Sequence, residues 1–448
     1  MSAPEGSLYR PLLWSLAALL AACGILLMIQ TIGAEIGPFR FAELGSRDAR
    51  ARLGLWVAGA AAPRGESWRA LLGGDEPVRE IASPAALDPA ELGAVVLPEP
   101  RALGASDAAA LTAYLRAGGG AVLTGSVGVR GADGSWRGYD VMRALLGGVE
   151  PIPLESDRAL SLVASRRGVL SSPLLPRERI AIRAEPGLPA IAGAGAELSW
   201  SATAEEGDAT SLGASLRRSV GRGRLVWLAV GPERAARDGD SRALRRVLQA
   251  AVAWAARRPL VEVLPWPGGA PFAAILETRT DGLEPSPKAL RFAAAAEIDA
   301  AEASAGLARL HAPTADLGAD GAWSDTAAEL AQRGAWLATR SELASWTRER
   351  SSIEATVRRA GPQRLVVAVT NRASGPAHGV VLRLYLNESA RSASVEATQL
   401  LQATPGLRFR AGAESLDLAL PDLAERSSAA FTLDYEPAAA GSPGGDPS

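Results

Sequence analysis

Residues 106–128 read SDAAALTAYLRAGGGAVLTGSVG and predict a helix, a glycine turn and a buried strand in succession. A Ser-Asp pair is a common helix start, and Gly118–Gly120 lets the backbone leave the helical conformation. The apolar run Ala121–Thr124 then predicts a strand that ends in the tight turn Gly125–Gly128. This succession indicates a parallel sheet flanked by helices.

The same alternation continues on both sides of this stretch. Further apolar runs predict strands at Leu53–Ala58, Ala94–Leu97 and Leu225–Val230. Asp240–Arg257 has helical spacing, and the Pro- and Gly-punctuated pieces between Gly148 and Gly223 indicate an inserted antiparallel layer. We therefore expect residues 48–262 to form one α/β domain with a flavodoxin-like parallel sheet.

Composition bounds the class of protein. The chain has 448 residues, of which 48% are hydrophobic, and this suits roughly two to four packed domains. Its net charge is −2 and its arginines are scattered along the sequence, so we expect no nucleic-acid partner. Histidine is the usual general base and zinc ligand, but the chain has only His311 and His378, together with the single cysteine Cys23. This inventory excludes most enzymes and predicts neither a cofactor nor a metal.

An N-terminal membrane segment is the clearest local signal. After a tip at residues 1–10, residues 11–34 carry no charge, and Leu12–Ile29 is long enough to cross a bilayer core as a helix of about 20 residues. Leu20–Gly24 also resembles a bacterial lipobox around Cys23, although the apolar run continues beyond it. Both interpretations attach the chain to a membrane.

The order of elements around residue 125 resembles the class I glutamine amidotransferase-like fold. In that family a strand enters an elbow of the form G-x-C-x-G that carries the nucleophile, and here Ser126 in Thr124-Gly125-Ser126-Val127-Gly128 stands in place of the cysteine. No histidine precedes residue 311, so Ser126 lacks the base that would activate it. We expect Ser126 to be a binding residue or simply a small turn residue.

The loop Gly131–Trp136 follows this elbow. Asp133 and Trp136 could contact a sugar, because an indole stacks on a pyranose ring while a carboxylate accepts hydroxyl hydrogen bonds. The alternative is an ordinary surface turn, for which the Asp-Gly dipeptide is typical.

Residues 263–350 are similar to the two ends of a polysaccharide deacetylase. The first end is Pro259–Gly269 with the strand Phe272–Leu276 and the acidic Glu277–Gly282; the second is the strand and helix of residues 334–350. Such enzymes bind a metal through an Asp and an H-x-x-x-H pair, yet Arg279 replaces an acid, no such pair exists, and only Asp281 remains. The resemblance implies a degenerate segment, with Asp281 as a weak binding candidate and Ala289–Leu307 as a helix.

The C-terminal part predicts an immunoglobulin-like β-sandwich over residues 351–436. Its expected strands are Ile353–Arg358, Arg364–Thr370, Val380–Asn387, Leu416–Leu420 and Ser428–Tyr435. Residues 437–448 should be disordered.

Together these features predict a non-catalytic bacterial envelope protein with a single membrane span. Counting arginines around the span would keep the large part in the cytoplasm, but the signal-anchor arrangement and the family resemblances favour an extracytoplasmic position at the inner membrane. By resemblance its role is a scaffold or carbohydrate-recognition subunit of a surface-polysaccharide system. The alternatives are a reduced deacetylase-type hydrolase and a structural subunit that binds protein partners.

Overall fold

The computed structural model describes most of the chain from residue 53 to residue 438. The described residues are 53–57, 68–69, 72, 78–83, 86–131, 133–154, 160–176, 178–183, 185, 187–192, 195–202, 212–279, 287–313, 322–386, 388–397 and 405–438. The predicted membrane span and the predicted disordered tail, apart from residues 437 and 438, lie outside them. None of the helices in the described part is long and apolar enough to cross a membrane.

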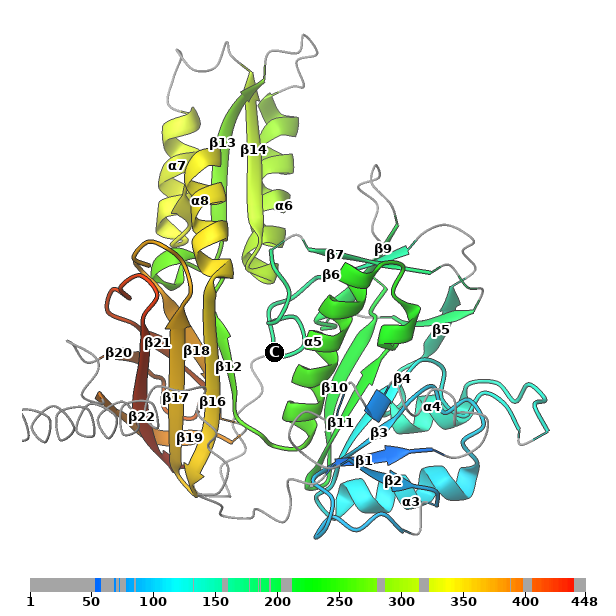
Figure 1. Ribbon diagram of the computed structural model, residues 1–448. Coiled ribbons are helices and arrows are strands. Elements are labelled where there is room, and N and C mark those ends of the chain that lie inside the picture. Colours follow the sequence, from blue (N-terminus) through cyan, green and yellow to red (C-terminus); the bar gives the residue numbers. More distant parts are fainter. Residues whose placement is uncertain are drawn as a thin grey trace, which may run out of the picture. The chain divides into compact units, whose positions relative to one another are not determined.

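A six-stranded sheet organises the first part of the chain (Figure 1). Its strands are β1 (Leu53–Trp56), β2 (Val78–Ile81), β3 (Ala94–Leu97), β4 (Gly120–Thr124), β10 (Ser215–Val220) and β11 (Gly223–Leu228). The order is β10-β11-β4-β3-β1-β2, in which every neighbouring pair is parallel except β10 with β11. β3, β4 and β11 are buried along their whole length, which explains their continuous apolar runs. The predicted α/β class with a parallel sheet is confirmed.

Helices α3 (Ala105–Arg116) and α5 (Asp238–Ala255) pack against β4 and β11, and the short α4 (Asp140–Leu145) contacts α3. A 3₁₀ turn, η3 (Pro232–Arg234), precedes α5. The C-terminal end of α5 lies so close to the first residue of β4 that a Cβ atom on Gly120 would stand 2.2 Å from the carbonyl oxygen of Ala255. Glycine at this position therefore permits the packing of helix on sheet.

Two small antiparallel sheets occupy the insertion between β4 and β10. They are formed by β5 (Pro151–Leu154) with β8 (Leu188–Ile191), and by β7 (Arg179–Ile182), β6 (Leu160–Ala164) and β9 (Leu198–Ala202) in the order β7-β6-β9. Their buried side chains, such as Leu162, Ile180 and Trp200, belong to the same core as the parallel sheet.

A three-stranded parallel sheet follows, in the order β14-β13-β15. Its elements are β13 (Ala273–Arg279), α6 (Pro287–Ser304), β14 (Leu307–Pro313), α7 (Ala322–Gln332), β15 (Trp336–Leu337) and α8 (Arg340–Ser351). The helix predicted at Ala289–Leu307 is wrong at its end, because Ala305 has a φ of 49° and Leu307 already begins β14.

The last part is a sandwich of two four-stranded antiparallel sheets. One has the order β16-β17-β22-β19 and the other β12-β18-β21-β20. The strands are β12 (Leu260–Val263), β16 (Ile353–Gly361), β17 (Arg364–Asn371), β18 (Val381–Tyr385), β19 (Ala390–Ala397), β20 (Gly406–Arg408), β21 (Ser415–Ala419) and β22 (Ser428–Pro437). Phe431 and Leu433 from one sheet share a core with Leu382 and Leu418 from the other.

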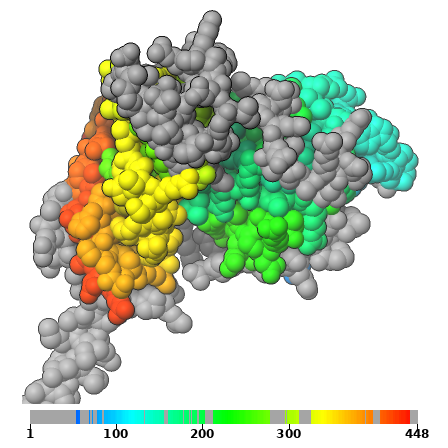
Figure 2. Space-filling view, turned by 90° about the horizontal axis from the view of Figure 1, so that it is seen from above, coloured from blue at the N-terminus to red at the C-terminus, as the bar shows by residue number. Residues whose placement is uncertain are grey.

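The sandwich draws on sequence far from its other strands. β12 follows α5 directly yet pairs with β18, so the boundary predicted at residues 262 and 263 lies within β12. Trp266, after β12, and Trp346, in α8, are buried in the sandwich core. The surface of α8, yellow in Figure 2, accordingly adjoins that of the orange and red sandwich strands.

Candidate functional site

The predicted elbow forms a tight turn at the carboxyl end of β4. Gly125 and Gly128 have φ angles of 64° and 65°, and a Cβ atom would stand 2.8 Å from Glu99 at the first position and 2.5 Å from Val141 at the second. Both positions therefore require glycine. Ser126 between them is 9% exposed, and its hydroxyl makes no hydrogen bond to any described residue.

Four charged residues lie beside this turn, and we call them the rim network: Glu99, Arg101, Glu185 and Arg234. Arg234 donates to Glu99 twice, from Nε to Oε1 at 2.8 Å and from Nη2 to Oε2 at 3.1 Å. Glu185 pairs with Arg234, and it accepts from Arg101 at 3.3 Å. The two acids and two bases thus neutralise one another where the amidotransferase resemblance places a nucleophile.

Glu99 is held in an unusual backbone conformation. It follows β3 with a φ of 40°, its side chain is only 4% exposed, and its N–H donates to Thr124 Oγ1 at 3.0 Å. A positive φ at a residue other than glycine costs roughly 1 to 3 kcal/mol. The bond to Thr124 and the ion pair with Arg234 fix the conformation, so β3, β4 and the turn before α5 are tied together.

Asp133 and Trp136 occupy a loop that continues from the elbow. The Asp133 carboxylate accepts from the hydroxyl of Ser135 at 2.6 Å and from its backbone N–H at 3.0 Å, and these bonds lower the pKa of Asp133. Trp136 is 58% exposed and meets Tyr139 edge-to-face with ring centroids 5.2 Å apart. An indole that is more than half exposed, in the same loop as a fixed carboxylate, is compatible with the predicted sugar contact.

The described part of the chain contains only some of the predicted deacetylase residues. Asp281 lies outside the described residues, and Glu277 and His311 are paired in register on β13 and β14. Within the described ranges, no group of three or more His, Cys, Asp and Glu residues could hold a metal ion.

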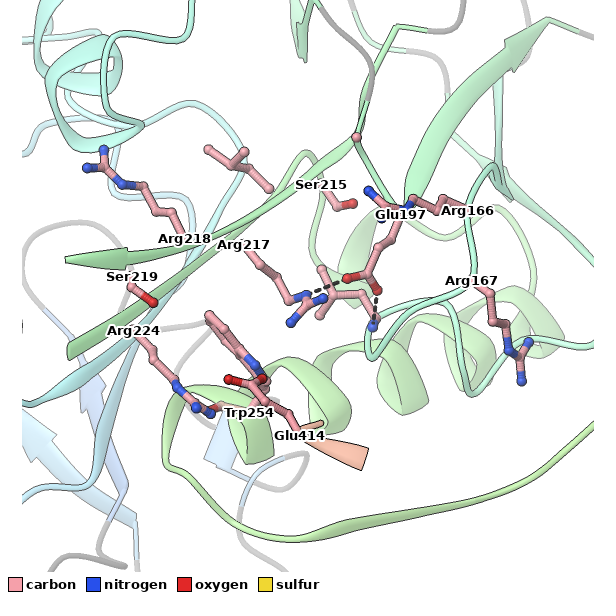
Figure 3. Close-up of a pocket in the computed structure, with 13 residues that line it drawn as sticks. Arg166, Arg167, Glu197, Ser215, Arg217, Arg218, Ser219, Arg224, Trp254 and Glu414 are labelled. Atoms are coloured by element: carbon pink, nitrogen blue, oxygen red, sulfur yellow. Dashed lines mark hydrogen bonds and ion pairs between the residues drawn. The ribbon is translucent and has the colours of Figure 1, made fainter. Parts of the chain in front are cut away.

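A cavity that we did not predict lies near the start of β11. It has a volume of about 380 Å³, and we call it the arginine pocket (Figure 3). Its charged and aromatic lining residues are Arg166, Arg167, Glu197, Arg217, Arg218, Arg224, Trp254 and Glu414. The arginines come from the loop after β6, from the edge strand β10 and from the second residue of β11.

Two guanidinium groups flank the same indole. The Cζ atoms of Arg217 and Arg224 lie 4.9 Å and 4.8 Å from the ring centroid of Trp254, each in a cation–π contact. Arg224 also donates from Nη1 to the Trp254 carbonyl oxygen at 3.2 Å. Burial is the main cause that lowers the pKa of Arg224 to about 10. The positive charges of these two guanidinium groups therefore lie close together where access of water is limited.

Glu197 builds one wall of the arginine pocket. Its carboxylate accepts from Arg217 Nε, as the dashed line in Figure 3 indicates, and from the backbone N–H of Leu170 and Ser171. Its side chain is 7% exposed, so these bonds offset the loss of hydration. Arg167 is likewise paired with the buried Glu262.

The sequence held one signal for this pocket. Arg166-Arg167 and Arg217-Arg218 are adjacent pairs, and the second lies in a Ser-Leu-Arg-Arg-Ser-Val stretch that forms β10. The hairpin of β10 and β11 places Arg217 and Arg224 on one face of the sheet, whereas Arg218 points to the opposite face. Counted along the sequence, however, the arginines appear scattered.

Comparison with known proteins adds little to this geometry. No family model and no curated protein matches the chain. Solved structures with weak likeness include a β-galactosidase from G. stearothermophilus, with 11% identity and a TM-score of 0.33, covering 86% of this chain and 40% of that one. A β-galactosidase from Rahnella sp. R3 has 12% identity and a TM-score of 0.35, with 85% and 40% covered.

A ThuA-like protein from Bacteroides uniformis has 12% identity and a TM-score of 0.32, covering 48% of this chain and 96% of that one. The chain spans about 40% of the length of the β-galactosidases that it matches. Likenesses this weak assign neither a family nor an activity to the chain.

Proposed function

We propose that this protein is a non-catalytic recognition or scaffold subunit of a bacterial surface-polysaccharide or envelope system. The run Leu12–Ile29 supports a single-span anchor in the inner membrane, and the large part of the chain is then extracytoplasmic. Carbohydrate would be recognised at the loop that carries Asp133 and Trp136, beside the elbow of Ser126.

The rim network is the observation that carries this proposal. A serine nucleophile needs a base within hydrogen-bond reach, usually a histidine oriented by a carboxylate. Of the two histidines in the chain, His311 lies on β14 in another sheet, and His378 lies in the sandwich with Nδ1 2.9 Å from Asp422 Oδ2. Arg234 and Arg101 engage the carboxylate nearest the elbow, so Glu99 cannot serve as a free base.

Features of the fold support the finer assignments within the same proposal. The order β2-β1-β3-β4-β11 and the glycine elbow after β4 favour a flavodoxin-like domain of the amidotransferase type. Two antiparallel sheets around one core favour an immunoglobulin-like sandwich. The short three-stranded sheet between them is compatible with a deacetylase remnant.

The proposal is tested on the full-length chain purified in neutral detergent. Three measurements are made on one preparation: labelling by a fluorophosphonate that reacts with activated serines, acetate release from acetylated glycans with metal content by mass spectrometry, and binding to immobilised envelope polysaccharides. We expect no serine labelling, no acetate and saturable glycan binding.

Other results would replace the proposal. Stoichiometric metal with acetate release that is abolished by Asp281→Asn would identify a reduced deacetylase. Labelling that disappears in Ser126→Ala would identify a serine hydrolase. Absence of glycan binding together with a stoichiometric co-purifying membrane protein would identify a structural subunit.

A further inference from the structure

The arginine pocket carries more positive charge than its own carboxylates neutralise. Five arginines and two glutamates line it. Arg217 is paired with Glu197, and Arg167 with Glu262 outside the lining. Arg218 points to the opposite face of the sheet, where its guanidinium donates to the backbone oxygen of Leu145 at 3.0 Å. Among the described residues, no carboxylate pairs with Arg166. A charge excess remains that an anion would offset.

The positive groups are held together by structure. Trp254 is 6% exposed and fixes Arg217 and Arg224 on its ring, while the hydrogen bonds of Glu197 fix the loop that carries Arg166 and Arg167. Like charges at short range repel, and they do so more strongly where water is scarce. This repulsion lowers the stability of the unliganded protein, and a bound anion would offset it.

The pocket also has unused hydrogen-bonding capacity at Arg166. This residue is exposed and lines the pocket, and its guanidinium makes no ion pair with the described residues. Guanidinium forks match the paired oxygens of a carboxylate or phosphate. A cavity of about 380 Å³ lies at the lower end of the range for small-molecule sites and can hold a group larger than a bare anion.

We propose that the arginine pocket binds a small ligand through an oxyanion, a phosphate or a carboxylate, attached to a body no larger than a single sugar. Arg166 supplies the cation that the ligand neutralises, and Arg217 and Arg224 add positive charge beside the Trp254 ring. This site is independent of the elbow and of Asp133 and Trp136, so its test is separate from the test of the function proposed above.

The test uses the full-length chain in neutral detergent and isothermal titration at fixed ionic strength. Four probes are compared: inorganic phosphate, glucose 6-phosphate, glucuronic acid and neutral glucose. We expect at least one anionic probe to bind about tenfold or more tightly than glucose. Preference for glucose 6-phosphate assigns the phosphate class, and preference for glucuronic acid assigns the carboxylate class.

Variants localise the binding. We expect Arg166→Gln to weaken the anionic probe by roughly tenfold, since it removes a charged donor. Arg218→Gln removes a guanidinium on the opposite face of the sheet and should change the affinity little. Arg242→Gln, at an exposed arginine on α5, is the matched control and should change nothing. Thermal unfolding of each variant checks the fold, which substitution of the exposed Arg166 should leave intact. Equal binding of glucose, no binding of any anion, or an affinity unchanged in Arg166→Gln would refute the proposal.

Discussion

Arg234 clasps the carboxylate of Glu99 with two hydrogen bonds, of 2.8 Å and 3.1 Å, across 135 residues of sequence. The pair joins the end of β3 to the turn before α5. Because both side chains are largely removed from solvent, the pair contributes to the fold as well as to the chemistry of the elbow.

Breaking this pair should destabilise the protein. Arg234→Gln leaves a buried carboxylate whose remaining cation, Arg101, is 3.5 Å away, and we expect a loss of about 3 kcal/mol. The measurement is urea unfolding followed by circular dichroism. Arg364→Gln is the control, since Arg364 forms a similar two-bond pair with Asp434 but has a side chain that is more than half exposed, and this pair should matter little. Equal losses in the two variants would contradict a special role for the buried pair.

A methyl group at Gly120 should separate β4 from α5. Its Cβ atom would stand 2.2 Å from the Ala255 oxygen and 3.0 Å from the Gly93 oxygen, both backbone atoms that cannot turn aside. We expect Gly120→Ala to cost at least about 2 kcal/mol of unfolding free energy. Gly239→Ala, in the first turn of α5 with open space around it, should leave stability equal or slightly raised. Thermal melts of the pair test this, and tolerance of Gly120→Ala would show that α5 can shift.

Stability should fall in alkali because of buried tyrosines. Burial raises the pKa of Tyr114, whose hydroxyl donates to the Leu92 oxygen at 3.0 Å, and burial likewise raises the pKa of Tyr385. A raised pKa means that the unfolded chain releases the proton first, so the stabilisation is complete below about pH 10 and is lost above it. Urea midpoints between pH 8 and pH 11 should decline, and the decline should be smaller in Tyr114→Phe. A flat profile would contradict the buried, neutral state.

Trp136 should be dispensable for folding and required for glycan binding. More than half of its surface is exposed, and its described ring contact is with Tyr139 alone. Trp136→Ala should therefore change the melting temperature little and abolish binding to the polysaccharide bound by the parent chain. The control is Leu337→Ala, which truncates an exposed apolar residue elsewhere in the chain. Trp200→Ala would not be suitable, because Trp200 is buried in the core. If Trp136→Ala binds the polysaccharide as strongly as the parent chain, the recognition site must lie elsewhere.

Sequence patterns predicted the strands that are buried on both faces. β1, β3, β4 and β11 are short apolar runs, and burial of both faces requires that composition. The sequence indicates β10 only as one of the antiparallel pieces between Gly148 and Gly223, because its Arg-Arg centre lies on an edge strand, where polar residues are tolerated. β14 escaped because its Ala and Leu residues continue the pattern of α6.

The candidate sites differ in the same way. Ser126 could be placed because its turn is local in sequence and glycine marks it. The arginine pocket could not, because Arg166, Arg217 and Trp254 are brought together only by the pairing of separate strands and the packing of α5. Ionic partners such as Glu262 for Arg167 are likewise fixed by tertiary structure.

β12 gives the chain an unusual order of assembly. The sandwich takes its first strand at residues 260–263 and its next at residues 353–361, and these two strands contact each other. The segment between these two strands is therefore an insertion in the sandwich, and the sandwich cannot finish folding until the insertion has been synthesised. During synthesis the complete α/β domain would emerge from the ribosome first, followed by β12 alone. About 90 further residues must be synthesised before the next sandwich strand, β16, emerges.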